Sequence, residues 1–261
     1  MAILYYSRMR ALTQLLPLLL AASSSSPASV PSSQTQSQPQ HHATVVSVYA
    51  AGIEDTSAFH PSNLSLDNPV SKYSYNTARS HMTYMHTLFF EYLASHLDDL
   101  PNLLSSFSLS ASPAQALNNS QLTLAHVFPG LVDGPTFGSP ELPGWFRWLW
   151  AWLVKPVFGW AILTKPEVCG ARLLSVADRS VYPPASPTPP TASAYAARRV
   201  VRSTTGQHGG GTYALGSSMD DLFKADKYAG MDREKMREVV WKHTIGVLEA
   251  TAGGGVFNAS T

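Results

Sequence analysis

The fold is decided by the stretch ATVVSVYAAG at residues 43–52, a run of β-branched and apolar residues that ends in small residues and glycine. Such a run, with no regular alternation of polar residues, is typical of a strand buried on both faces of a parallel sheet. A second run of this kind is LTLAHVFPG at 122–130, and a shorter one is GGGTYALG at 209–216. Three parallel strands are therefore predicted.

Stretches of helical character separate and flank these strands. The longest spans residues 72–96 and contains neither proline nor glycine. Residues 165–177 and 232–250 are two further predicted helices, the first with a proline near its first turn. Strands that alternate with helices predict an α/β fold with a parallel sheet. We expect one domain over residues 1–261.

The first 22 residues, MAILYYSRMRALTQLLPLLLAA, admit two interpretations. Two arginines, an apolar run and small residues after it are features of a signal peptide. Leucines at helical spacing are features of an amphipathic core helix; they are Leu12, Leu15, Leu16 and Leu19. Two tyrosines precede the charges, which a signal peptide does not require, so the core helix is the preferred interpretation.

Two low-complexity segments interrupt the pattern. Residues 23–42 are a Ser/Pro/Gln tract, and residues 183–193 are rich in proline. Neither composition can bury a core. We therefore expect a disordered loop at 23–42 and a Pro-rich loop at 183–193.

The segment GWFRWLWAWLVKPVFGWAIL at 144–163 is nearly all apolar and carries five of the six tryptophans. Arg147, Lys155 and Pro156 interrupt it, and its length is marginal for a membrane span. Tryptophan favours membrane interfaces, so peripheral membrane contact is one interpretation. The preferred interpretation is a lid of two short helices over a hydrophobic substrate pocket.

Composition excludes some classes of function. Apolar residues make up 44% of the 261 residues and charged residues 13%, which suggests a large core or some membrane contact. The net charge is +1 without a basic cluster, so no nucleic-acid partner is expected. The single cysteine, Cys169, excludes an internal disulfide and a cysteine-built metal site. We expect no metal and a cytoplasmic location, with membrane association as the alternative.

Within the longest predicted helix, KYSYNTARSHM at 72–82 carries Tyr75 and Arg79 four residues apart. This spacing puts a phenol and a guanidinium one turn apart on the same helix face. A nearby cation favours the phenolate, and such a phenol can exchange a proton with a carbonyl or an alcohol. The pattern is also common by chance, in which case it is an ordinary surface pair.

The order of the segments resembles the C-terminal half of the short-chain dehydrogenase/reductase family. YYSRMRALTQLLPLL resembles the family's helix before the fifth strand, VVSVYAAG its serine-bearing strand and YSYNTAR its Tyr-x-x-x-Lys helix. FPGLVDGPT resembles the Pro-Gly loop at the nicotinamide, and TKPEVCGARLLSVA the helix after the substrate lid. The likeness covers most of residues 4–178 and is closest to divergent fungal members. It implies an incomplete Rossmann-like sheet, the C-terminal half of a doubly wound fold with flanking helices.

The resemblance also implies catalytic roles. Tyr75 would be the acid/base, and Arg79 stands where the family has a lysine. Arginine keeps the charge, but its planar fork has a different geometry and does not release protons. Ala50 occupies the best-aligned place of the family's serine, which leaves Ser47, within the strand, as the candidate serine.

The same resemblance implies a cofactor, NAD(P), with NADP as the first choice. Its candidate contacts are Tyr75, Arg79, Pro129, Gly130, Val132 and Thr136. The substrate would be a hydrophobic small molecule with a carbonyl or alcohol group, because the segment 144–163 is apolar. A homodimer through the helix at 72–96 is a further expectation.

The family's Gly-rich dinucleotide turn has no counterpart before residue 22, and HGGG at 208–211 lacks the strand–turn–helix context. We therefore expect an oxidoreductase that is truncated at its N-terminus, with its first mononucleotide-binding half absent. The alternative is a catalytically inactive dehydrogenase-like scaffold that binds a partner or a hydrophobic ligand.

Overall fold

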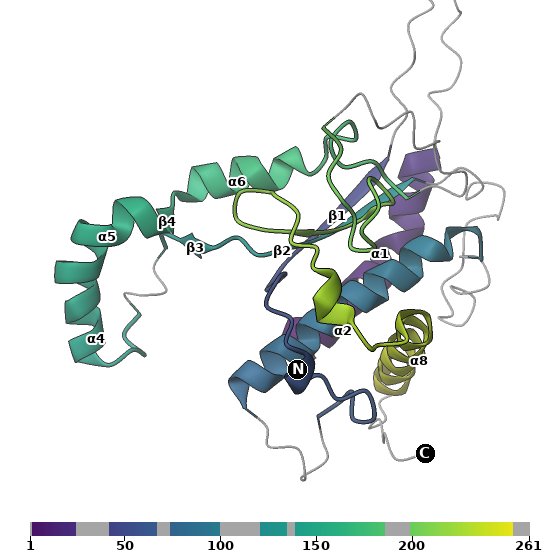
Figure 1. The fold of residues 1–261 in the computed structure, drawn as a ribbon, viewed down its shortest axis with the longest axis horizontal. Helices are drawn as coiled ribbons and strands as arrows, with labels where there is room; N and C mark the ends of the chain where they lie inside the picture. Colours follow the sequence, from purple (N-terminus) through teal and green to yellow (C-terminus); the bar gives the residue numbers. More distant parts are fainter. Residues whose placement is uncertain are drawn as a thin grey trace, which may run out of the picture.

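A computed structural model describes residues 2–24, 42–66, 74–99, 121–134, 139–185 and 199–252. Its centre is a parallel sheet of three strands in the order β1-β2-β5 (Figure 1). The strands are β1 (Ala43–Val48), β2 (Leu122–Val127) and β5 (Thr212–Leu215). All three follow the predicted apolar runs, so the prediction of an α/β fold with a partial Rossmann-like sheet is confirmed.

The central strand is the most deeply buried. Every residue of β2 is buried, whereas β1, at the edge, has four half-buried residues out of six. In the parallel register Val45 lies opposite Leu124, and Leu124 lies opposite Thr212 on the other side. The apolar, β-branched composition suits this position because both faces of β2 are covered.

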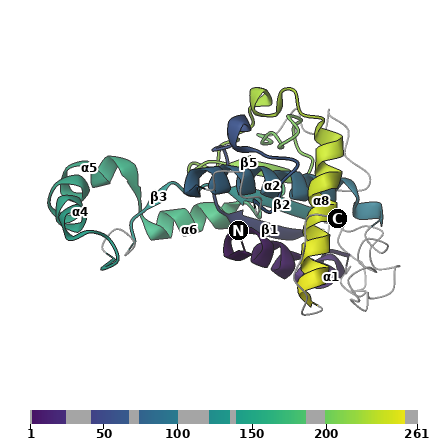
Figure 2. The ribbon, with the colours of Figure 1, turned by 90° about the horizontal axis from the view of Figure 1, so that it is seen from below.

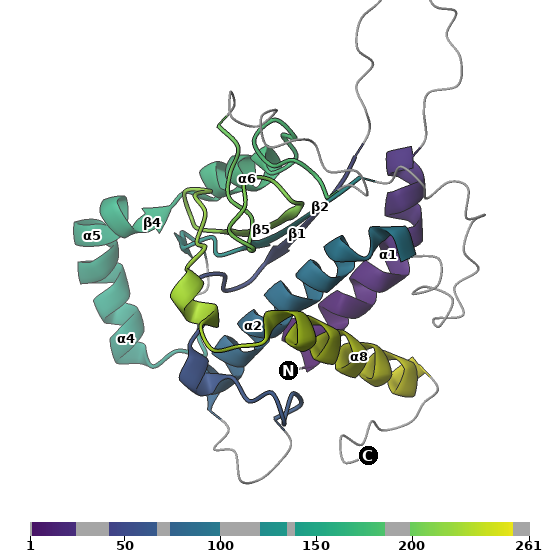
Figure 3. The same ribbon diagram turned by 45° about the vertical axis from the view of Figure 1, so that its right-hand side comes forward.

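Three helices lie on one side of the sheet, with α1 and α2 against the strands and α8 packed on α2 (Figures 2 and 3). They are α1 (Ser7–Ser24), α2 (Tyr75–Ser95) and α8 (Arg233–Ala252), and a π-helical turn, η1 (Ala2–Tyr6), precedes α1. The helix α2 begins where the Ser74 side chain accepts the backbone N–H of Thr77 at 3.1 Å. Most of α2 is buried between the sheet, α1 and α8. Little of it is therefore left for a homodimer contact, which stays a prediction.

The other face of the sheet is covered by one short helix and by loops. The end of α6 (Pro166–Ser175) and the loops at 178–185 and 199–222 pack there. The apolar cluster on this face consists of Ala125, Val127, Val176, Tyr182, Tyr213, Leu215 and Met219. The described residues also form three short 3-10 helices, η2 (Thr56–Ala58), η3 (Leu97–Asp99) and η7 (Ala225–Tyr228).

The Trp-rich segment forms a helical arm that extends away from this body (Figures 1 and 2). It consists of α4 (Gly144–Leu149), the π-helical η6 (Trp150–Val154) and α5 (Lys155–Ile162). The pairing of β3 (Leu131–Val132) with β4 (Leu163–Thr164) closes its base. Two separate short helices were expected, but the helical path is continuous. The π-turn lies next to Pro156, which has no N–H for a regular helical bond.

Four of the five tryptophans of the arm are solvent-exposed, and Trp150 is half-buried. Trp145, Trp148, Trp152 and Trp160 keep between 64% and 86% of their surface accessible. The arm therefore covers little of the body, and the lid function stays a prediction. None of the described helices combines the length and the apolarity that crossing a bilayer requires.

Both low-complexity loops lie largely outside the described residues. Of the Ser/Pro/Gln tract, only its two ends are described. Of the Pro-rich loop, residues 183–185 are described, and Ala185 exchanges backbone hydrogen bonds with Leu122 at the start of β2. This part of the loop is thus attached to the sheet.

Candidate functional site

The three strands run in parallel, so their carboxyl ends meet at one edge of the sheet. A glycine follows each strand there: Gly52, Gly130 and Gly216. Gly52 and Gly130 have φ angles of 84° and 74°, a region that other residues rarely adopt. A Cβ on Gly130 would lie 2.9 Å from the Cβ of Ser217. The loop after β5 therefore passes directly over the end of β2.

A cavity of about 460 Å³ opens at this edge. It is lined by Gly130, Leu131, Ala161, Ile162, Leu163, Thr164, Lys165, Val168, Arg172, Ser217 and Ser218. Arg172 donates from Nη1 to the Ser217 carbonyl at 2.8 Å, which holds the loop after β5 against α6. The cavity thus joins the ends of β2 and β5 to the last residues of the Trp-rich arm.

The predicted cofactor contacts lie only partly at this cavity. Gly130 lines it, and Pro129 directly precedes Gly130. Val132 is in β3, where it pairs with Thr164 at the base of the arm. Thr136 lies outside the described residues, so its predicted role has no structural account.

The helix α2 runs antiparallel to the strands, and its first turn lies beyond their carboxyl ends. Thr87 Oγ1 lies 3.5 Å from His126 Nδ1 in β2, and one turn earlier Thr83 Oγ1 lies 3.4 Å from the carbonyl oxygen of Ala50. Tyr75 is eight residues before Thr83, about 12 Å along the helix axis. Tyr75 therefore lies beyond the carboxyl ends of the strands.

Tyr75 is the most accessible tyrosine of α2, with 67% of its surface exposed. Tyr84 is fully buried and donates its hydroxyl to the Lys227 carbonyl at 2.7 Å. Tyr92 is near the other end of the helix and stacks on Trp241 with ring centroids 4.9 Å apart. Tyr75 is thus the α2 phenol that a substrate could reach.

Arg79 lies one turn after Tyr75 on the same helix, as predicted. Within the described ranges, neither side chain has a hydrogen bond or an ion pair. Both are therefore able to turn toward a bound molecule. Their catalytic and cofactor roles stay predictions.

Ser47 lies on a different side of the site. It is 9% exposed, and Arg8 of α1 donates to its hydroxyl at 3.4 Å. Ala50 is closer to α2 but has no polar side chain, and its backbone N–H donates to His126 Nε2 at 3.2 Å. The structure does not bring Ser47 together with Tyr75.

Sequence reasoning missed a stack of three rings beneath the strand ends, two of them fully buried histidines. Tyr49 and His126 each stack on His86, with ring centroids 5.4 Å and 5.0 Å away. Burial lowers the pKa of His86 to about 4 and holds the pKa of His126 well below its usual value. Both imidazoles are thus uncharged at neutral pH. Their only signal in the sequence is that each lies in an otherwise apolar stretch.

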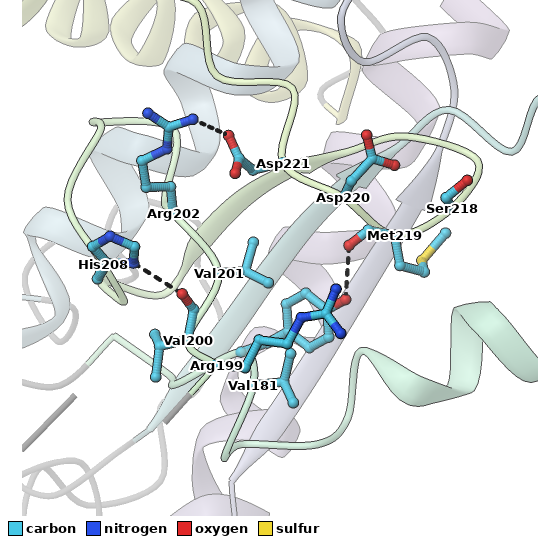
Figure 4. A pocket seen from close by; sticks show the side chains of 11 residues that line it. Val181, Arg199, Val200, Val201, Arg202, His208, Ser218, Met219, Asp220 and Asp221 are labelled. Atoms are coloured by element: carbon cyan, nitrogen blue, oxygen red, sulfur yellow. Dashed lines mark hydrogen bonds and ion pairs between the residues drawn. The ribbon is translucent and has the colours of Figure 1, made fainter. Parts of the chain in front are cut away.

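A second cavity, of about 430 Å³, lies between the loops on the face of the sheet that α1 and α2 do not cover (Figure 4). Arg202 pairs there with Asp221 at 3.0 Å, and His208 Nδ1 donates to the Val200 carbonyl at 2.9 Å. These charges and donors are engaged within the protein. No cluster of three potential metal-binding side chains occurs among the residues that the structure describes. The cavity at the strand ends is therefore the better candidate site.

Comparison with known proteins gives two relatives. The first is a protein named short-chain dehydrogenase/reductase from Stachybotrys chartarum, 31% identical over 251 residues, which are 95% of this chain and 58% of the relative. The second is an oxidoreductase from Emericella nidulans, 26% identical over 248 residues, which are 95% of this chain and 60% of the relative. No protein-family profile and no solved structure matches the chain.

The chain thus spans somewhat more than half the length of the curated relatives that it matches. The similarity nevertheless extends over nearly all of its residues, and the parallel sheet with flanking helices is the architecture that the relationship requires. The two sources are fungi, in keeping with the predicted likeness to fungal members. The chain belongs to the short-chain dehydrogenase/reductase family.

Proposed function

We propose that the protein is an NAD(P)-dependent oxidoreductase that interconverts a carbonyl and an alcohol on a hydrophobic small molecule. The observation that carries the proposal is the cavity at the carboxyl ends of β2 and β5, where Gly130 meets the end of the Trp-rich arm. Open α/β sheets bind their ligands outside the carboxyl ends of the strands. The names of the two relatives support the same reaction class.

The residues of this chain fit the cofactor at one end only. Gly130 lines the cavity, and its positive φ lets the chain turn at the end of β2, so the nicotinamide ring would lie in this cavity beside the strand end. A pyrophosphate needs a Gly-rich turn between a strand and a helix N-terminus. No described helix begins at such a turn. The proposal therefore assigns the nicotinamide and substrate end of the site to these residues, and not the phosphate end.

Tyr75 is the proposed proton donor and acceptor, at its phenolic oxygen. Arg79, one turn away, would stabilise the phenolate by its charge. A bound cofactor would supply the hydride, while these two side chains would handle only the proton. Tyr75 is exposed and Arg79 is half-buried, so the phenol would reach a substrate that lies beyond the strand ends with the guanidinium behind it.

The apolar arm is the proposed substrate surface. Ala161, Ile162 and Leu163 line the cavity, and the exposed tryptophans continue this apolar surface outward. The same side chains would also suit peripheral contact with a membrane. Substrate binding is the preferred proposal because the end of the arm forms part of the cavity wall.

The test is an assay of the protein isolated from the cells that produce it. NADPH and NADH oxidation is measured with aldehydes and ketones of increasing alkyl length. We expect turnover with NADPH at rates that rise with alkyl length. Failure to reduce any carbonyl with either nucleotide would overturn the proposal.

A matched pair of variants ties the activity to the cavity. Gly130→Ala should abolish it, because the new Cβ meets Ser217 and the backbone has a φ of 74°. Gly134→Ala should leave it intact, because among the described residues the nearest contact of its Cβ would be the Val132 carbonyl at 3.9 Å. Equal activities of the two variants would remove the Gly130 loop from the site.

A second candidate function is a binding protein without turnover. One observation favours it: no serine hydroxyl faces the site at the end of β1. The hydroxyl of Ser47 lies next to Arg8, and Ala50 has no hydroxyl. Without a polarising hydroxyl, the site lacks one of the family's usual catalytic groups. Saturable binding of a long-chain ketone, with no nucleotide oxidation, would select this candidate.

A further inference from the structure

The helix α6 connects the base of the Trp-rich arm to the body (Figure 1). Three residues of one helix face line the cavity at the strand ends, namely Lys165, Val168 and Arg172. Their spacing of three and four residues places them in one row, with the two cations about 10 Å apart along the helix axis. Two long basic side chains thus stand along one wall of the cavity.

Both basic side chains keep donors that the protein does not use. Arg172 donates from Nη1 to the Ser217 carbonyl at 2.8 Å, while its Nε and Nη2 have no acceptor among the residues that the structure describes. The ammonium of Lys165 is exposed and has no partner in the same ranges. A bound molecule can therefore accept hydrogen bonds from both.

Among the described residues, no acidic side chain lines this cavity. Asp133 pairs with Lys155 at 2.8 Å, and Asp220 lines the other cavity (Figure 4). Glu167 is exposed on a different face of α6. The described wall thus carries charge of one sign, which attracts ligands of the opposite sign.

The rest of the described wall is glycine, apolar side chains and hydroxyl groups. The apolar side chains are those of Leu131, Ala161, Ile162, Leu163 and Val168, and the hydroxyls are those of Thr164, Ser217 and Ser218. A molecule that joins an apolar body to one anionic group is complementary to both parts of this wall.

The free edge of Arg172 indicates which anion fits. Nε and Nη2 lie on the same edge of the guanidinium, and through this edge Arg233 binds the carboxylate of Glu91 within this protein. Two parallel hydrogen bonds of this kind match the two oxygens of a carboxylate. The free edge of Arg172 therefore suits a carboxylate.

We propose that the substrate carries a carboxylate on its apolar body, and that Arg172 and Lys165 hold this carboxylate on the α6 side of the cavity. The inference rests on the proposed function, because it names the substrate class of the same site. The acid lies toward α6, and the apolar body lies against the end of the arm.

The test is equilibrium dialysis of decanoate, 1-decanol and decyl phosphate against the protein isolated from the cells that produce it. We expect decanoate to bind saturably and at least about tenfold more tightly than 1-decanol. Equal affinities of decanoate and 1-decanol would overturn the proposal. Decyl phosphate that binds more than about tenfold more tightly than decanoate would overturn the choice of a carboxylate.

Two lysine variants tie the binding to this wall. Lys165→Gln should weaken decanoate binding about tenfold and leave 1-decanol binding unchanged. Lys155→Gln is the matched control, because Lys155 pairs with Asp133 and does not line the cavity. Equal decanoate affinities in the two variants would contradict the assignment. Arg172→Gln is less decisive, because it also releases the loop after β5.

Dialysis uses neither cofactor nor turnover, so failure of this inference and failure of the proposed function give different results. Decanoate binding that depends on Lys165, without reduction of any carbonyl, would contradict the proposed reaction alone. Reduction of decanal by a protein that does not prefer decanoate to 1-decanol would contradict the carboxylate site alone. If both hold, 10-oxodecanoate should have a KM about tenfold lower than its methyl ester.

Discussion

The helical arm at 144–162 is more apolar than the helix α2, yet the arm is exposed and α2 is buried. In α2 even polar side chains such as His86 and Glu91 are buried, whereas in the arm only Gly159 is buried. The helix α2 has the sheet, α1 and α8 around it, whereas the arm extends away from the body and meets other segments at its base, where Lys155 pairs with Asp133 (Figure 3). Burial thus follows from the neighbours of a helix and not from its composition. Stability should reside in the body.

The largest expected effect is the loss of stability of the body in acid. Burial lowers the pKa of His81 and His86 to about 4, and that of His126 also falls well below its usual value. The unfolded chain therefore takes up protons below pH about 6.5 that the folded protein does not accept. The free energy of unfolding should fall by about 1.4 kcal/mol per pH unit for each histidine as the pH drops from about 6.5 toward 4.

Urea unfolding at pH 7, 6 and 5 measures this effect. Glu54, whose pKa is raised by burial, works in the opposite direction and offsets part of the loss. His86→Gln should make the unfolding free energy depend less steeply on pH, by the contribution of one histidine. His208→Gln, at an exposed position, is the matched control and should leave this pH dependence unchanged. A stability that is constant from pH 6.5 to 4.5 would show that the buried histidines do not titrate as described.

The second effect concerns the buried carboxylate of α2. Glu91 is 1% exposed and accepts hydrogen bonds from Arg233 Nε at 2.9 Å and Arg237 Nε at 2.8 Å. Glu91→Ala removes the buried carboxylate from two half-buried guanidinium groups and leaves each with one remaining acceptor, which should cost about 3–5 kcal/mol of unfolding free energy. The matched control is Glu238→Ala, whose exposed pair with Lys242 should contribute nothing measurable. Equal urea midpoints for the two variants would contradict the assignment.

The smallest effect is expected in the arm, and it gives the direct contrast of the two regions. Phe89 is fully buried in α2 and stacks on Trp241 with ring centroids 4.8 Å apart, so Phe89→Ala should cost about 3–5 kcal/mol. Trp152 is 72% exposed, so Trp152→Ala should change the unfolding free energy by less than about 0.5 kcal/mol. Thermal and urea unfolding test both. A large loss in Trp152→Ala would mean that the arm is packed in solution.

The strands and long helices could be predicted because their patterns are local. The run at 43–52 shows a strand by itself, and α2 begins at a serine cap within three residues of its predicted start. The path of the loops at 199–222 could not be predicted, because hydrogen bonds between distant segments fix it. The π-turn of the arm also depends on a single proline within a continuous helix.

The candidate site was predicted in part. Gly130 was identified from the Pro-Gly loop, but Arg172 and Ser217 are brought to the same cavity from 42 and 87 residues farther along the chain. No periodic pattern joins such positions. Ser47 could be placed on a strand, but which way its hydroxyl turns depends on Arg8 of α1, which the strand's own sequence does not reveal.

The central functional claim is that the protein transfers a proton at Tyr75, and one rate comparison tests it most directly. NADPH-dependent carbonyl reduction is measured for Tyr75→Phe and for Tyr92→Phe, which removes a hydroxyl from the far end of the same helix. We expect Tyr75→Phe to lose about 10²–10⁴-fold in rate and Tyr92→Phe to retain it. Undiminished turnover in Tyr75→Phe would contradict the account and remove Tyr75 from the mechanism.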